Sequence, residues 1–346
     1  MCRVSWSHAV LLFAAGILGG LCGSIAGLAS VATYPALLLT GLPPVTANVT
    51  NTVSLVFTGV GSIWGSRPEL RGQGAFLKRI LPFAAVGGIA GVAINTAHEL
   101  GHQRAQSERW LSKVALAQTG YGHFYVEHNR GHHSRVATPE DPASSRLGES
   151  LYAFQFRSFF GSLRSAWRIE RRRLTCHHKR VWSLHNDILN SWLMTVVLFA
   201  ILLAVFGLDI VPWLIGQAVV GICLLESINY LEHYGLRRQR RADGNYEQVR
   251  ASHSWNSNSV ISNVFLFHLQ RHSDHHANPQ RRYQALCHAD EAPQLPSGYA
   301  TMVLLALFPP LWRRVMDPRV LAHYNGDVRL AAMSPRKERK LLKRYC

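Results

Sequence analysis

The stretch that decides the fold runs from about residue 188 to about residue 231. It reads ILNSWLMTVVLFAILLAVFG over 188–207 and VPWLIGQAVVGICLLESINYL over 211–231. Each apolar run is about 20 residues long, which is the length that a helix needs to cross a bilayer. The turn between them, Leu208 to Pro212, is short, so we expect an antiparallel pair of spanning helices whose outer ends lie on one side of the membrane.

Further apolar segments at about 8–32, 49–65 and 80–97 predict additional spans. The 346 residues are 48% hydrophobic and 16% charged. We therefore predict an all-α fold, a polytopic integral membrane helical bundle. The first apolar segment is longer than the core of a secretory signal, so we expect it to be retained. Stretches at about 111–126 and 301–312 are too short or too polar to span, and we expect them to be re-entrant, interfacial or buried against the bundle.

The net charge of +17 has its source in basic loops that flank the predicted spans. These are Arg157 to Arg180, Arg237 to Arg241, and Arg336 to Arg344. By the positive-inside rule, this side of the bundle faces the cytoplasm of a cell inner (plasma) membrane. We expect no nucleic acid as a partner, because no binding motif accompanies the charge. The basic face could dock an acidic protein, and the terminal run is expected to be solvated or to bind headgroups of membrane lipid.

Four histidine clusters lie near the ends of apolar segments. They read His98-Glu-Leu-Gly-His102, Glu127-His-Asn-Arg-Gly-His-His133, Glu232-His233 and His272-Ser-Asp-His-His276. Imidazole suits iron, zinc, copper or nickel, and these nine donors exceed the roughly four to six sites of one ion, so two ions are predicted. The six cysteines form no C-x-x-C pair, which argues against structural zinc and iron–sulfur sites. A redox-active di-iron centre on the cytoplasmic side is favoured.

Helical spacing predicts how the clusters chelate. Residues four apart lie on one helix face, so the pairs His98/His102 and His128/His132 are each expected to bind one metal. The same rule places His272, His275 and His276 on one side of a helix. The neighbouring carboxylates are expected to accept a second ring N–H or to ligate, and the sequence leaves the choice open; they are Glu99, Glu127, Glu232 and Asp274. Structural roles are expected for His8, His123, His185, His253, His268, His288 and His323.

The longer motifs around these clusters resemble those of a known family. They are Asn95-Thr-Ala-His-Glu-Leu-Gly-His102, Gly122-His-Phe-Tyr-Val-Glu-His-Asn-Arg-Gly-His-His133, Asn229-Tyr-Leu-Glu-His-Tyr-Gly-Leu236 and Leu269-Gln-Arg-His-Ser-Asp-His-His-Ala277. From about Gly88 onward the chain resembles the membrane-bound alkane hydroxylases, a branch of the histidine-box di-iron enzymes that also holds the integral-membrane fatty-acid desaturases. The Asn229 element favours the hydroxylase branch over the desaturases.

This resemblance implies a ligand set, a reaction and partners. Two irons would be held by His98, His102, His128, His132, His133, His233, His272, His275 and His276. The family activates O2 and inserts one oxygen atom at the terminal carbon of a medium or long n-alkane, which gives a primary alcohol. Its electrons come from rubredoxin, which is reduced by an NADH-dependent flavin reductase. Because this chain has no pair of C-x-x-C motifs, the rubredoxin would be a separate protein.

The N-terminal part resembles a different family. Its segments Gly16 to Gly27, Tyr34 to Pro44 and Ala47 to Thr52 are similar to the first repeat of sulfite exporter TauE/SafE-type permeases. We therefore expect a permease-like transmembrane segment at 1–87 and an alkane hydroxylase or desaturase-like di-iron domain at 88–346, with a seam near 82–95.

Charge placement also indicates a recombined chain. If His98 is cytoplasmic, the basic residues at 67–79 lie on the outer side, against the positive-inside rule. Two alternatives to alkane hydroxylation stay open: another histidine-box enzyme, either a fatty-acyl desaturase or an alkyl-group hydroxylase, and an inactive fusion with a permease fragment. The hypothesis of a transporter depends on residues 1–83 alone, and these lack the second repeat that such a permease needs.

Overall fold

The computed structural model describes residues 93–259, 263 and 266–345, together with residues 7, 10–14, 17, 36, 37, 39 and 40. The chain divides into two compact units, Met1–Pro82 and Phe83–Cys346. The predicted spans at 8–32, 49–65 and 80–97 lie largely outside the described residues, as do most of the seam and the basic residues at 67–79. The domain boundary after residue 87 stays a prediction.

The described residues of the second unit are helical wherever they form regular structure. Residues 93–101 form its first described helix. The elements that follow are α6 (Gln106–Ala117), α7 (His123–Val126), the π-helix η1 (Glu127–His132), α8 (His133–Arg135), α9 (Leu151–Cys176), α10 (Asp187–Phe206), η2 (Leu208–Ile210), α11 (Val211–His233), η3 (Ala251–His253), α13 (His272–Ala277), η4 (Tyr283–Ala285), α14 (Tyr299–Ala306), α15 (Pro309–His323), η5 (Val328–Leu330) and α16 (Glu338–Tyr345). Among the described residues there is no β-strand, and the all-α prediction is confirmed.

Helices α10 and α11 form the predicted membrane hairpin. The side chain of Asn186 caps the start of α10 by accepting from the backbone N–H of Ile188 at 3.0 Å. Gly207 ends α10 at a φ of +79°, a conformation that favours glycine, and a proline lies in the first turn of α11. Both helices are long and apolar enough to span, and only 11% of the most apolar window of each is buried. Apolar helices whose side chains the rest of the protein does not cover are typical of helices that contact lipid.

The two weaker apolar stretches do not span. Residues 111–126 are divided between α6 and α7, which are separated by a turn at 118–122. Residues 301–312 are divided between α14 and α15, with a proline at the start of α15. Helices of this length are too short to cross a bilayer, as the sequence predicts.

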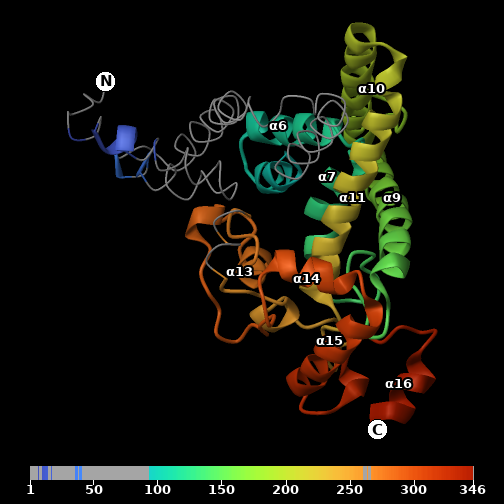
Figure 1. Cartoon of the computed structure of the whole chain (residues 1–346). Coiled ribbons are helices and arrows are strands. Elements are labelled where there is room, and N and C mark those ends of the chain that lie inside the picture. The colour runs from blue at the N-terminus through green and yellow to red at the C-terminus, as the bar shows by residue number, and fades with distance from the viewer. Residues whose placement is uncertain are drawn as a thin grey trace. The chain divides into compact units, whose positions relative to one another are not determined.

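Two apolar cores hold the described helices together. The larger surrounds the start of α9, the end of α11, α14 and α15, and includes Phe154, Tyr230, Tyr234, Trp255 and Trp312. The smaller joins α6, α7, α9 and α10. Figure 1 shows α14, α15 and α16 gathered at the end of α11 that lies away from the α10–α11 turn. η1 directly continues α7 of the smaller core, and His233 is the last residue of α11 at the larger core, so the cores fix the positions of the histidines in these segments.

Candidate metal centre

The nine histidines of the four clusters come together as two groups. Group A consists of His98, His102, His128, His133 and His275. Group B consists of His132, His233, His272 and His276. Within each group, one potential ligand atom per residue lies within 4.8 Å of all the others. The residues lie up to 177 positions apart in group A (98 to 275) and up to 144 in group B (132 to 276), so the tertiary fold builds both.

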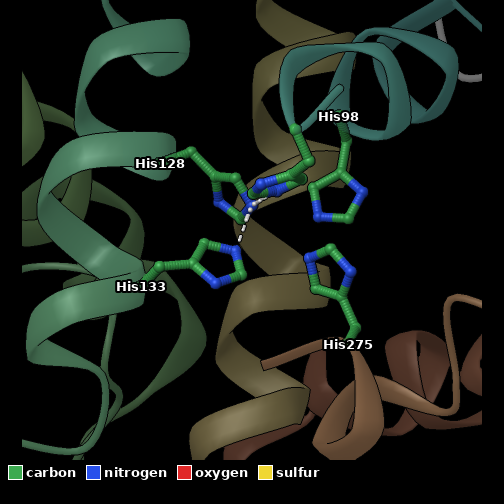
Figure 2. Close-up of side chains that lie close together, drawn as sticks. His98, His128, His133 and His275 are labelled. Carbon is green, nitrogen blue, oxygen red and sulfur yellow. Dashed lines mark hydrogen bonds between the residues drawn. The ribbon is translucent and has the colours of Figure 1, made fainter. Parts of the chain in front are cut away.

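Group A takes its side chains from the 93–101 helix and the turn that follows it, from the η1 region, and from α13. In Figure 2, His98, His128, His133 and His275 point toward a common centre. The Nε2 atom of His128 lies 3.1 Å from Nε2 of His102 and 3.1 Å from Nε2 of His133. His102 and His133 are half-buried, whereas the other three are buried.

Group B lies at the end of the α11 span and is buried throughout. The Nε2 atom of His272 lies 3.3 Å from Nε2 of His233 and 2.9 Å from Nε2 of His276. His132 joins them, with its ring centroid 4.9 Å from that of His233 and 4.9 Å from that of His276. Groups A and B are neighbours, because the rings of His133 and His276 have centroids 4.4 Å apart.

The predicted pairing of His128 with His132 is wrong, and the reason is local. Residues Glu127–His132 form a π-helix, in which the backbone N–H of His133 donates to the carbonyl of His128, five residues back. Spacing of this kind turns His128 and His133 to one side, into group A, and sends His132 to group B. The structure does bring His98 and His102 together in group A, with His98 in the 93–101 helix and His102 in the turn that follows it.

The three imidazoles of α13, which were expected on one side of a helix, do not enter the same group. His272 and His276, four apart, enter group B, whereas His275 enters group A. Asn256 fixes the start of this short helix: its Oδ1 accepts from the backbone N–H of Ser273 at 3.0 Å, and its Nδ2 donates to Ser273 Oγ at 2.7 Å. α13 therefore lies between the two groups and contributes to both.

The donor set fits metal ions. The buried Nε2 atoms of His98, His132 and His275 have no hydrogen-bond partner among the described residues. Unpaired buried nitrogen is costly unless something binds it. Burial is also the main cause that lowers the imidazole pKa across the site, to about 4 for His98 and well below the usual value for His102, His128, His133, His272, His275 and His276. Neutral imidazole is the form that ligates metal.

The four predicted carboxylates play different parts. Glu232 Oε2 lies 3.1 Å from Nε2 of His272, on the side of the ring that faces group B, and Tyr299 donates its hydroxyl to Glu232 Oε1 at 3.2 Å. The other three bond away from the imidazoles. Glu127 pairs with Arg135 at 2.6 Å, Asp274 with Arg281 at 2.7 Å, and Glu99 accepts from Gln103 at 3.2 Å and from the Tyr283 backbone N–H at 3.3 Å.

Asp141 is a site residue that the sequence analysis missed. Its Oδ2 lies 2.9 Å from Nδ1 of His132 and accepts from Ser144 Oγ at 2.6 Å. Burial opposes ionisation of Asp141, but His132 and these hydrogen bonds outweigh it and lower its pKa to about 2. The carboxylate therefore orients His132 through the nitrogen that does not face group B. The Pro-Glu-Asp-Pro sequence at 139–142 lies outside the four clusters, so proximity in sequence could not reveal it.

His253, for which a structural role is expected, contacts group B through its backbone carbonyl. Its carbonyl oxygen accepts from Nδ1 of His233 at 3.4 Å. The imidazole of His253 pairs instead with Glu247 at 3.1 Å. The hydrogen bond from Nδ1 of His233 to the His253 carbonyl sets the tautomer of His233, so that its Nε2 faces group B.

A largely apolar cavity of about 420 Å³ adjoins both groups. His98 and His128 of group A and His272 of group B lie in its wall. The apolar part of the wall includes Phe124, Leu224, Leu225, Ile228, Leu266 and Val303. The sequence could not predict which apolar residues form this wall, because helices far apart in the sequence contribute to it. A ligand without polar groups could lie here against the metal-facing imidazoles.

Comparisons with known proteins match both parts of the chain. The family model for fatty acid desaturase matches residues 78–306, and the model for sulfite exporter TauE/SafE matches residues 12–110, so the two matches overlap across the predicted seam. Both resemblances drawn from the motifs are confirmed.

Individual relatives give the same result. The chain is 51% identical over 275 residues to alkane 1-monooxygenase of Acinetobacter baylyi, which covers 80% of this chain and 67% of the relative. It is 50% identical over 244 residues to alkane 1-monooxygenase of Pseudomonas putida, covering 70% of this chain and 61% of the relative. The xylene/toluene monooxygenase hydroxylase component XylM of Pseudomonas putida is 29% identical over 242 residues, covering 67% and 61%. The chain spans about two thirds of the length of these curated relatives.

Proposed function

Because this chain belongs to the alkane 1-monooxygenases of the fatty acid desaturase family, we propose that it converts medium or long n-alkanes to primary alcohols. The observation that carries the proposal is the apolar cavity that reaches both histidine groups. An alkane offers no polar handle, so a wall of apolar side chains beside the metal-facing imidazoles is the surface that can hold one.

We propose that the metal is iron and that each group holds one ion. His98, His102, His128, His133 and His275 would bind the first, and His132, His233, His272 and His276 the second. Nine imidazoles with no thiolate suit ferrous iron, and ferrous iron can donate electrons to O2. The overall reaction consumes the alkane, O2, two electrons and two protons and yields the alcohol and water.

The protein residues prepare this chemistry by position and by charge. Asp141 and the carbonyl of His253 hold His132 and His233 with Nε2 toward group B. Glu232 lies at the cavity wall, where it can ligate the second ion or balance its charge. The leucine and isoleucine side chains exclude water from the substrate. Because each methylene is worth only about 1–3 kcal/mol of discrimination, the length of the cavity would select chain length over a range of alkanes.

We propose rubredoxin as the separate electron donor and the inner membrane as the location, with the metal centre toward the cytoplasm. The support is the charge of the segments beside the centre. Exposed arginines and lysines follow α9, and more lie in the segment after α11, whose last residue is the group B ligand candidate His233. By the positive-inside rule, this end of the hairpin is cytoplasmic, and a basic face attracts an acidic donor.

The N-terminal resemblance defines the main rival. If residues 1–87 form a permease-like segment, they replace the helices that precede the metal-binding domain in an alkane hydroxylase. An inactive fusion would then retain the iron site without turnover. The other rival, a desaturase or alkyl-group hydroxylase, differs in product.

The test is to purify the full-length chain in detergent and to supply octane or hexadecane with rubredoxin, its reductase and NADH. We expect about two irons per polypeptide and 1-alkanol as the product. Two irons with no product from any alkane would favour the inactive fusion, and an unsaturated product from a fatty acyl substrate would favour a desaturase. The variant Leu225→Trp, which fills part of the cavity wall, should shorten the preferred alkane and leave the iron content unchanged.

A further inference from the structure

A second cavity contains none of the clustered histidines in its wall and is lined by cations. It measures about 590 Å³ and lies between α15 and α16. Its cationic lining residues are Arg313, Arg314, Lys337, Lys340 and Arg344, and Asp317 is the one carboxylate among them. Five cations against one carboxylate leave a strongly positive cavity, which suits an anion.

These cations lack carboxylate partners within the described part of the chain. None of the five forms an ion pair within 4.0 Å among residues 93–259 and 266–345. The nearby carboxylate of Asp317 is already engaged, because Tyr234 donates its hydroxyl to Oδ1 at 2.9 Å and Tyr345 donates to Oδ2 at 3.3 Å. Burial and the charges of Arg313 and Lys340 lower the pKa of Lys337, which indicates that the cations repel one another.

One wall of the cavity, α15, lies against the end of a membrane-spanning helix. α15 packs against the end of α11: the rings of Trp312 and Tyr230 have centroids 5.1 Å apart, and Tyr234 follows the last residue of the span. At the start of α15, Phe308 is 59% exposed and Leu311 is 51% exposed. Large exposed apolar side chains one turn from unpaired cations are typical of a surface that lies at a membrane interface.

A neighbouring cavity extends the positive surface toward α9. It measures about 670 Å³ and shares Gly148 and Lys337 with the first. Arg146, Arg157 and Arg336 line it, as does Phe156, which is 72% exposed. Arg157 is paired with Glu149 at 2.7 Å, so most of the free charge belongs to the first cavity. The Nζ of Lys337 donates to the Gly148 carbonyl at 2.7 Å and so joins the two cavities.

We propose that the cavity between α15 and α16 binds the phosphodiester headgroup of an anionic membrane phospholipid. The cations would contact the phosphate oxygens, and Phe308 and Leu311 would contact the first part of the acyl chains. Arginine and lysine are the usual donors to phosphate, and basic pockets beside spanning helices on the cytoplasmic side bind anionic headgroups. This site is independent of the metal centre and of the proposed oxidation.

The test is native mass spectrometry of the full-length protein in detergent, titrated with phosphatidylglycerol and, separately, with phosphatidylcholine. The variant Arg314→Gln/Lys340→Gln/Arg344→Gln removes three exposed cavity cations. The matched control Arg171→Gln/Arg172→Gln/Lys179→Gln removes three exposed cations near the end of α9. We expect the wild type and the control to bind phosphatidylglycerol preferentially, and the cavity variant to lose about 10- to 100-fold in affinity for it, given the strength of cation–headgroup attraction.

Three outcomes would overturn the proposal. Equal binding of phosphatidylglycerol by the cavity variant and the control would place the lipid elsewhere. Displacement of the lipid by inorganic phosphate at equal concentration would show a site for free phosphate. Unchanged lipid binding with weakened direct binding of rubredoxin would show that the cavity docks the acidic protein instead. A monodisperse elution profile checks the fold of each variant, and Lys340→Gln alone gives a milder form of the same comparison.

Discussion

Groups A and B are built from the same kind of side chain but differ in their surroundings. Group B is buried throughout and has two carboxylates beside it, with Asp141 2.9 Å from His132 and Glu232 3.1 Å from His272. Group A has five imidazoles and, among the described residues, no carboxylate oxygen within 4.0 Å of their nitrogens. Two of its members, His102 and His133, are half-buried.

Because of this difference, we expect the two proposed irons to be unlike. Carboxylates beside group B offset the charge of its ion and fix its ligands, so this ion should be held more firmly. Group A relies on imidazole alone, and two of its ligand candidates are only half-buried. The ion in group A should therefore exchange more readily and be the first to meet an incoming electron donor or chelator.

The largest expected effect is the loss of one imidazole from either group. His272→Ala removes a ligand candidate of group B that also lies in the cavity wall, and His133→Ala removes a half-buried one of group A. Each variant should lose detectable alcohol formation and fall to about one iron per polypeptide, because an ion that has lost one of its ligands is bound weakly. Iron analysis after gel filtration measures this. If either variant keeps two irons, that histidine is no ligand.

The next effect concerns the carboxylate that supports group B. Asp141→Asn should weaken iron binding in that group by about 10- to 100-fold, the usual cost of removing a partner that orients a ligand. The control is Glu140→Gln, since the side chain of Glu140 is 52% exposed. Competition with a colorimetric iron chelator gives the affinity. Equal affinities for the two variants would contradict the role of Asp141.

A smaller effect is kinetic. A water-soluble ferrous chelator should remove the iron in two phases, and the fast phase should correspond to group A because His102 and His133 are less buried than any histidine of group B. In His133→Ala the fast phase should disappear. Loss of both irons in a single phase would show that the two groups are equally accessible and would remove the contrast drawn between them.

The smallest effect is the acid sensitivity of the metal-free protein. Burial, with help from the charge of His132, lowers the pKa of His98 from 6.5 to about 4. The folded state then binds fewer protons than the unfolded state between these values, so stability is present above pH ~6.5 and falls as the pH drops toward ~4. At pH 5 the loss from His98 alone is about 2 kcal/mol. Thermal unfolding from pH 7 to pH 5 should therefore be less pH-dependent in metal-free His98→Gln than in the metal-free wild type.

The sequence predicted the fold where the pattern is long and apolar. Spans at 188–207 and 211–231 are found as α10 and α11, because a run of this length has few alternatives. It also predicted which histidines gather, since all nine of the clustered imidazoles enter the two groups.

The distribution of these histidines between the groups could not be predicted. Spacing arguments assume an α-helix, and the π-helix at Glu127–His132 exchanges the partners of His128. Other features depend on segments that meet only in the tertiary structure. These are the placement of His275 in a different group from His272 and His276, the hydrogen bond from His132 to Asp141, and the cavity wall.

The most direct test of two unlike irons is Mössbauer spectroscopy of the full-length protein loaded with Mössbauer-active iron. We expect two quadrupole doublets of equal area, because a group of five imidazoles and a group of four with carboxylates nearby impose different fields on iron. In Asp141→Asn, one doublet should change and the other should stay. A single doublet for the wild type, or one iron per polypeptide, would contradict the account.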